Sequence, residues 1–337
     1  MLHCGCSSKS HLVPCSGLAM IDTNLLNTLL SNFLQSSSEI TGALIVDVDG
    51  LILAQQSVQS LNEAMIGAMM SVLEQTMTKI KRFASTSYGS GTFDTNDFRI
   101  FYIELGGKRP SIFVMVCDAY ANLERLIPFS YLAAEKASLI LHSRSTSAEL
   151  PNYAPSGDQI ITVEKGGDFQ GKAIKLMMTG QEEVGKSSLV DMYFDGDFHS
   201  GYRPTIGVSY RSQDLQVMSQ ISLRFHVFDL SGMKAFAKVR RFYYTGADLI
   251  LIMFDYTNME TMTFAGDWLE EAKHFNNNRS CRYLLIGNKI DLISDREALF
   301  EKAGDFARQR DLQLFNISSK TGEGIDEIFM HVFSLYC

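Results

Sequence analysis

The strongest constraint on the fold of this chain is the stretch TGQEEVGKSS (residues 179–188), which contains the spacing GxxxxGKS. It follows the apolar, strand-length run AIKLMMT (173–179) and precedes SLVDMYF (188–194), which begins like a helix. A strand, a glycine-containing loop and a helix in this order let backbone N–H groups and the helix N-terminus surround phosphate groups. The sequence therefore predicts a phosphate-binding loop over 180–188.

Two of the four variable positions in this loop carry carboxylates, Glu182 and Glu183, which repel phosphate. At about 8 Å and an effective dielectric near 20, each charge pair costs about 2 kcal/mol, and less if the side chain points to water. Several backbone N–H groups, Lys186 and Mg²⁺ can exceed that cost, so we interpret the loop as functional. The two acids are expected to face water or a basic group of a partner, where they either obstruct or recruit an incoming arginine.

Length and composition bound the remaining possibilities. A chain of 337 residues with 46% hydrophobic content suggests two domains. A net charge of −8 gives no general attraction to nucleic acid or anionic lipid, so phosphate binding must come from local geometry. No apolar run approaches the roughly 18 residues of a membrane span and no signal peptide is evident, so a cytoplasmic protein, at most peripheral at a membrane, is expected. The six cysteines are scattered as in a reducing compartment: Cys4, Cys6, Cys15, Cys117, Cys281 and Cys337.

The first half begins with residues 1–19, which show no periodicity and predict a disordered leader; a metal site or lipid attachment at its three cysteines is the alternative. Periodicity then predicts a helix that Asp22 caps, followed by a hairpin over 40–55 with its turn at Asp49-Gly50. A Met-rich helix over 62–82 and strands over 97–105 and 111–117 are predicted next. The last predicted element is a helix over 126–141, in which Pro128 is tolerable only near the start. With so few crossover helices, we expect an antiparallel sheet with helices to one side.

The element order and the hairpin GALIVDVDGLILA give the first half a resemblance to the Roadblock family, small α/β domains that dimerise and commonly sit beside small GTPases. The resemblance implies a Roadblock-like domain over 20–143 and a homodimer through the 62–82 helix. An unrelated small α+β domain is the alternative. Residues 144–171 are rich in Ser, Pro and Gly and predict a linker, in which the run IITV (160–163) can pair as a short strand.

Four further motifs follow the phosphate loop, each at a predicted strand end or in a loop. Thr205 lies in a loop after the first helix, and DLSG (229–232), NKID (288–291) and SSK (318–320) each follow an apolar strand. Ligands of open α/β sheets bind outside the carboxyl ends of the strands, so these loops are expected to converge. Ser187 can offer a hydroxyl to Mg²⁺, Asp229 can hold the water shell of the metal, and Lys186 can meet the terminal phosphates.

This second half, 172–337, resembles the Ras superfamily and most closely its Rab-like branch, a resemblance that extends into FYYTGADLILIMFDYTN (242–258). The resemblance implies a P-loop small GTPase domain, with a mostly parallel six-stranded sheet and helices on both faces, that binds GTP or GDP with Mg²⁺. It implies a metal site at Ser187, Thr205 and Asp229, and a catalytic group of Lys186, Thr205, Gly232 and Met233. The nucleotide site it implies comprises Gly180, Gln181, Glu182, Glu183, Val184, Gly185, Lys186, Ser187, Ser188, Phe198, Thr205, Gly232, Asn288, Lys289, Asp291, Ser318, Ser319 and Lys320.

Within that site the resemblance pairs Asp291 with the guanine edge, whose N1–H and amino group suit a carboxylate, and places Lys289 and Phe198 against the faces of the base. The chain departs from the family at DLSGMK, where the family usually has DTAGQE, so Met233 replaces the glutamine that orients the attacking water. A thioether cannot donate a hydrogen bond, which predicts slow GTP hydrolysis unless another side chain substitutes. Arg203 either acts on the phosphates in cis or faces solvent, and Cys337 lies in no CaaX box.

Two functional hypotheses of different class follow. The first is a guanine-nucleotide switch with a built-in Roadblock-like module and unidentified effector and regulator proteins. The second is a scaffold that holds GTP or GDP with vestigial catalysis, as Met233, Glu182 and Glu183 suggest. An ATP-using P-loop enzyme is disfavoured by NKID and SSK together.

Overall fold

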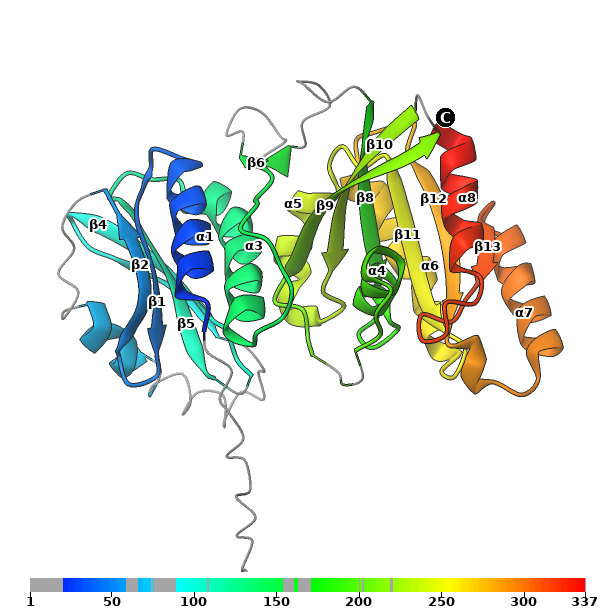
Figure 1. Ribbon diagram of the computed structural model, residues 1–337, viewed down its shortest axis with the longest axis horizontal. Helices are drawn as coiled ribbons and strands as arrows, with labels where there is room; N and C mark the ends of the chain where they lie inside the picture. The colour runs from blue at the N-terminus through cyan, green and yellow to red at the C-terminus, as the bar shows by residue number, and fades with distance from the viewer. Residues whose placement is uncertain are drawn as a thin grey trace, which may run out of the picture.

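The computed structural model describes residues 21–58, 66–73, 75, 89–107, 109–153, 161–162, 171–199, 201, 203–218 and 221–336. Its described strands form a five-stranded sheet in the first half, a six-stranded sheet in the second half and a small pair between them (Figure 1). The predicted leader, most of the predicted Met-rich helix and Cys337 lie outside the described residues.

The first sheet is antiparallel throughout, with the order β2-β1-β5-β4-β3, as the sequence predicts. Its predicted hairpin is confirmed: β1 pairs with β2, and the Asp47 carboxylate accepts hydrogen bonds from the N–H groups of Asp49 and Leu51 in the turn. Strand β3 was missed because its residues are mostly exposed and lack an apolar pattern. The strands are β1 Ile40–Asp47, β2 Ile52–Ser57, β3 Ser90–Asp94, β4 Phe98–Glu104 and β5 Ser111–Asp118.

Helices cover both faces of this sheet, which corrects the expectation that they lie to one side. Helices α1 (Thr23–Gln35) and α3 (Leu123–Leu141) pack on one face, where Phe33 stacks on Phe129 at 5.4 Å between ring centroids. The described helical residues Ile66 and Met70 pack on the other face. The reason is visible in β1 and β5, where nearly every position is buried, so both faces need an apolar cover.

Helix α3 begins three residues earlier than predicted, with Asn122 as its N-cap residue, so Pro128 lies in its second turn. Pro128 is thus nearer the start of the 19-residue helix than its end, one turn further in than predicted. A short antiparallel pair follows, β6 (Asn152–Tyr153) with β7 (Ile161–Thr162), which confirms a strand within the predicted linker.

The second sheet has the order β13-β12-β11-β8-β10-β9 and is parallel except for β9, as predicted. Helices α4 and α8 pack on one face of it and α5, α6 and α7 on the other. The strands are β8 Lys172–Gly180, β9 Val208–Met218, β10 Ile221–Leu230, β11 Leu249–Asp255, β12 Arg282–Asn288 and β13 Gln313–Asn316. The helices are α4 Lys186–Asp195, α5 Ala237–Tyr244, α6 Glu260–Phe275, α7 Arg296–Arg308 and α8 Ile325–Tyr336, with short 3-10 turns at Lys234–Phe236 and Ile290–Leu292.

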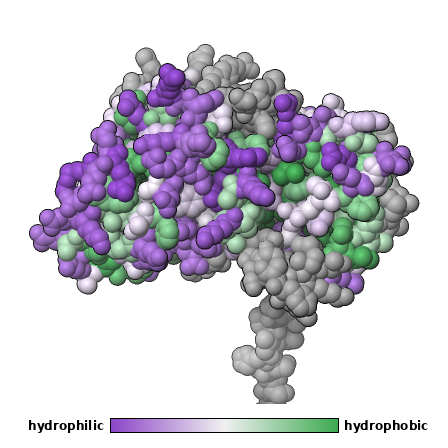
Figure 2. Space-filling view, turned by 180° about the vertical axis from the view of Figure 1, so that it is seen from behind, coloured by the Kyte–Doolittle hydropathy of each residue, from purple (hydrophilic) through white to green (hydrophobic). Residues whose placement is uncertain are grey.

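The two halves are packed together through α3, which lies between its own sheet and the β9 and α5 elements of the second half (Figure 1). One cluster of buried apolar side chains therefore includes members of both halves, such as Tyr131 and Phe236. The back of the second half is mostly hydrophilic (Figure 2). Among the described helices, none is both long and apolar enough to cross a bilayer.

Candidate functional site

The carboxyl ends of the parallel strands meet around one pocket of about 310 Å³. Most of the residues predicted for the site line it: Glu182, Glu183, Gly185, Lys186, Ser187, Ser188, Phe198, Thr205, Gly232, Asn288, Lys289, Asp291, Ser319 and Lys320. Five other predicted residues, Gly180, Gln181, Val184, Asp229 and Ser318, are not among the residues that line it. Asp229 and Ser318 are hydrogen-bonded to the lining residues Ser187 and Asp291. Met233 is not among the residues that line the pocket.

The phosphate loop connects β8 to α4 and is held close to neighbouring backbone. Gly180 has a φ of +141°, and a Cβ there would lie 2.4 Å from the carbonyl oxygen of Met253 on β11. A Cβ on Gly232 would lie 2.2 Å from the N–H of Glu182, so the DLSG loop touches the phosphate loop directly. Such approaches are open only to glycine. The two glycines therefore let the phosphate loop lie directly against β11 and the DLSG loop.

Lys186 lies in the first turn of α4 and reaches back over the loop. Its ammonium group donates to the carbonyl oxygens of Gly180 at 3.0 Å and Gln181 at 2.7 Å. The residue also lines the pocket.

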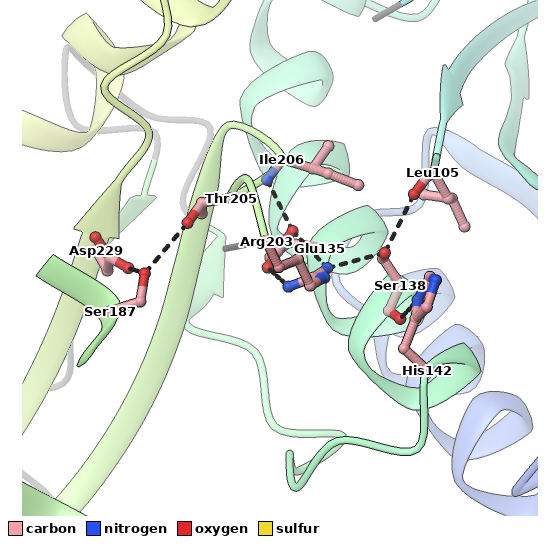
Figure 3. Close-up of polar contacts among 9 residues, drawn as sticks. All are labelled: Leu105, Glu135, Ser138, His142, Ser187, Arg203, Thr205, Ile206 and Asp229. Carbon is pink, nitrogen blue, oxygen red and sulfur yellow. Dashed lines mark hydrogen bonds and ion pairs between the residues drawn. The ribbon is translucent and has the colours of Figure 1, made fainter. Parts of the chain in front are cut away.

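The three candidate metal ligands lie together. The Ser187 hydroxyl donates a hydrogen bond to Oδ2 of Asp229 and lies 3.4 Å from the Thr205 hydroxyl (Figure 3). Oδ1 of Asp229 is buried and has no hydrogen-bond partner within the described part of the chain. Two hydroxyls and a carboxylate with a spare buried oxygen are the hard oxygen donors that Mg²⁺ prefers, so these residues fit that ion.

Burial tunes the two charged groups at the base of the pocket. It raises the pKa of Asp229 to about 6, with Lys186 and the Ser187 hydrogen bond acting in the opposite direction. It lowers the pKa of Lys186 to about 8, opposed chiefly by Asp229. A divalent cation beside Asp229 favours its ionised form, since added positive charge lowers the pKa of a carboxylate.

On the other side of the pocket, Asn288 connects two loops. Its amide donates to the carbonyl oxygen of Val184 at 2.8 Å and accepts from the N–H of Ser319 at 2.9 Å. The Ser318 hydroxyl donates to the Asp291 carboxylate at 2.7 Å and holds that side chain in place. These bonds connect the NKID loop to the SSK loop and to the phosphate loop.

Three residues that were not predicted from the sequence contribute to the pocket or contact its lining. The Lys289 ammonium pairs with Asp255 at 2.6 Å, so a residue at the end of β11 orients it. Arg144, assigned to the linker, lines the pocket together with Asp191. Asp255 follows an apolar strand, a signal that could have identified it, whereas nothing in the sequence around Arg144 points to this position.

The guanidinium of Arg203 pairs with the Glu135 carboxylate of α3 at 2.7 Å, and its side chain is 18% exposed, which corrects the alternative in which it faces solvent. Arg203 also lines the pocket, so its action on phosphates in cis stays a prediction. Met233 is half-buried, packs against the apolar cluster and accepts a hydrogen bond at its carbonyl oxygen from Arg240 at 2.8 Å.

A GxxxxGKS loop between a parallel strand and a helix, with the cluster of oxygen donors of Ser187, Thr205 and Asp229 beside it, is typical of a P-loop nucleotide-binding domain. Residues 175–336 match the Ras family. The Ras-related protein Rab-4 of Dictyostelium discoideum is 31% identical over 157 residues, which cover 47% of this chain and 76% of that protein. The chain belongs to the Ras family. Proteins of this family bind GTP and GDP with Mg²⁺ and hydrolyse GTP.

Glu183 provides a test of the loop, because it is exposed and has a φ of +65°. A side chain in this left-handed region costs on the order of 1 kcal/mol, whereas glycine adopts it freely. We expect Glu183→Gly to melt about 2 °C higher than Glu183→Gln, since both remove the charge and only glycine relieves the backbone. Thermal unfolding of the two variants without nucleotide measures the difference. Equal melting temperatures would show that the backbone at this position is unstrained.

Proposed function

We propose that this protein is a guanine-nucleotide switch. The observation that carries the proposal is the convergence of the phosphate loop, the Ser187, Thr205 and Asp229 cluster, and the NKID and SSK loops on one pocket. Membership of the Ras family supports the same conclusion.

Each part of the pocket has a role in this proposal. The loop N–H groups and Lys186 bind the phosphates, and the Gly232 N–H meets the terminal one. Ser187, Thr205 and Asp229 would hold Mg²⁺, which when bound neutralises phosphate charge. Because Thr205 and Gly232 lie on loops outside the strands, contact with a terminal phosphate orders these loops, and its loss releases them.

Selectivity for guanine follows from Asp291. Its carboxylate accepts hydrogen bonds, and guanine presents a donor pair, N1–H and the amino group, that adenine lacks. Lys289 and Phe198, which both line the pocket, are placed to cover the faces of the base. The bond from Ser318 keeps Asp291 in the required orientation.

Isothermal titration with GDP, GTP, ADP and ATP in the presence of Mg²⁺ tests the proposal. We expect binding of the guanine nucleotides only. Asp291→Ala should weaken GDP binding about 100-fold, because two hydrogen bonds to a charged group contribute about 1.5–3 kcal/mol each. Folded, nucleotide-free protein that takes up neither GDP nor GTP would contradict the whole proposal.

Slow hydrolysis is the second part of the proposal. In this family a glutamine orients the attacking water, and Met233 offers neither a donor nor a useful acceptor. Met233 is half-buried and Arg203 pairs with Glu135, which supports the proposal that neither side chain orients the attacking water in place of the glutamine.

The variant Met233→Gln should therefore hydrolyse bound GTP about 100-fold faster, the low end of what a positioned polar group contributes. Met233→Leu is the matched control, since it keeps an apolar side chain of similar size and should leave the rate unchanged. Single-turnover assays measure both. A Met233→Gln rate equal to that of the parent would show that the missing glutamine does not limit the reaction.

The exposed acids Glu182 and Glu183, together with Met233, favour a second candidate, a scaffold that keeps its nucleotide without turnover. The two candidates differ in one measurement. A switch releases phosphate from added GTP over hours, whereas a scaffold yields protein with a constant bound nucleotide after extraction and chromatography.

We further infer that the N-terminal half is a Roadblock-like module that dimerises. The order of helix, hairpin, helix, three strands and helix around an antiparallel sheet supports the resemblance. Val72, on the described part of the Met-rich helix, is 63% exposed, as expected for a residue at a partner surface.

Size-exclusion chromatography with light scattering should give twice the chain mass of 37.7 kDa at micromolar concentration. The variant Val72→Glu should shift this mass towards the monomer, because a charge is costly in an apolar interface. A strict monomer for the parent protein would contradict the dimer.

A further inference from the structure

The surface of the second half that changes with nucleotide in the proposed function is covered by α3 of the first half. The ring of Tyr131 lies on Gly207, so closely that a Cβ there would be 2.8 Å from Cδ1 of the tyrosine. The same ring packs edge-on against Phe236, at 5.7 Å between centroids. The segment 203–208, strand β9 and the residues before α5 thus share one apolar contact with α3.

Polar groups make this contact specific. The Glu135 side chain is 2% exposed, and its carboxylate accepts two bonds from Arg203, at 2.7 and 3.2 Å, and one from the N–H of Ile206 at 2.8 Å. Arg203 also donates to the Ser138 hydroxyl at 2.9 Å. A buried carboxylate without such partners costs several kcal/mol. Glu135 therefore selects one conformation of the segment that it binds.

That conformation is the one that forms the metal site. Thr205 lies between the two residues that Glu135 binds, and its hydroxyl lies 3.4 Å from that of Ser187. Polar contacts consequently connect Asp229 with Ser187, and Ser187 with the 203–208 segment, which binds α3 (Figure 3). From α3 the Ser138 hydroxyl donates to the carbonyl oxygen of Leu105, the residue that follows β4 of the first sheet.

The geometry points to the N-terminal half as the built-in partner of the nucleotide-dependent surface. Helix α3 binds the 203–208 segment in the conformation that places Thr205 beside Ser187, and it thereby favours the binding of GTP over GDP. This inference rests on the proposed function. If Thr205 leaves Ser187 when the terminal phosphate is lost, the segment moves and Glu135 loses donors. By linkage, α3 strengthens the binding of the triphosphate to the same degree that the triphosphate strengthens the binding of α3.

Attachment on the same chain gives α3 an advantage over other partners. A tethered element has an effective concentration in the millimolar range for a short linker, so a separate protein that needs this surface must displace it. The diphosphate form, with a weakened α3 contact, is the form in which the surface of the second half becomes accessible. The bound nucleotide thus first changes the strength of the contact between the two halves of the chain.

The test compares dissociation constants for GDP and for the non-hydrolysable analogue guanylyl imidodiphosphate, with Mg²⁺, on the full chain. Glu135→Ala and Arg203→Ala should each weaken binding of the analogue about tenfold, within the usual range of coupling between sites, and change GDP binding less than about twofold. The double variant should cost less than the sum of the two single variants, because both remove the shared bonds between Arg203 and Glu135. Glu124→Gln, an exposed carboxylate of the same helix, is the matched control and should change neither constant.

Hydrogen exchange gives a second measurement that does not depend on variants. In the parent protein, amides of 129–138 should be better protected with the analogue than with GDP. If Glu135→Ala fails to fold, Arg203→Ala and this measurement decide, since Arg203 lies in a loop and is 18% exposed. A parent protein that binds neither nucleotide refutes the proposed function. A parent that binds both, with the ratio unchanged in the variants or equal protection in both states, overturns only this inference.

Discussion

The parallel register of the second sheet is the constraint on which the site depends. β8 is paired on one side with β10 and on the other with β11, and β11 is paired with β12, so Gly180, Asp229 and Asn288 all lie at the carboxyl edge. A shift of one residue in any of these pairings would turn the side chains to the opposite face and misplace the loops. The nearly continuous apolar character of β8 and β11 keeps the sheet buried on both faces and fixes this arrangement.

The conflict between the two glutamates and phosphate is resolved by their placement. Glu182 and Glu183 are exposed at the mouth of the pocket, where water screens their charge, whereas Lys186 is buried where charge acts most strongly. The lowered pKa of Lys186 and the raised pKa of Asp229 share one cause, which is removal from water. The pocket thus concentrates its electrostatic effect at its floor and tolerates acidic residues at its rim.

Much of the fold and of the site could be predicted from the sequence, because strand periodicity and loop motifs are local signals. The phosphate loop, NKID and SSK are short, and their glycines and polar residues carry the information within a few positions. The pairing of Glu135 with Arg203 could not be predicted, since the two residues are 68 positions apart and a contact between a helix and a distant loop leaves no local signal in the sequence. The early start of α3 was missed for a related reason: tertiary packing stabilises a helix in spite of an internal proline.

The shared apolar cluster has a consequence for how the molecule folds. Side chains from both halves, among them Phe129, Tyr131, Phe236 and Tyr243, belong to one buried cluster, and the Tyr243 hydroxyl donates to the carbonyl oxygen of Pro128 at 2.6 Å across the boundary. Separating the halves would break the contact between the Tyr131 and Phe236 rings and the Tyr243 hydrogen bond. Heating should accordingly unfold the chain in one cooperative step. Either half expressed alone should expose apolar surface and be prone to aggregation.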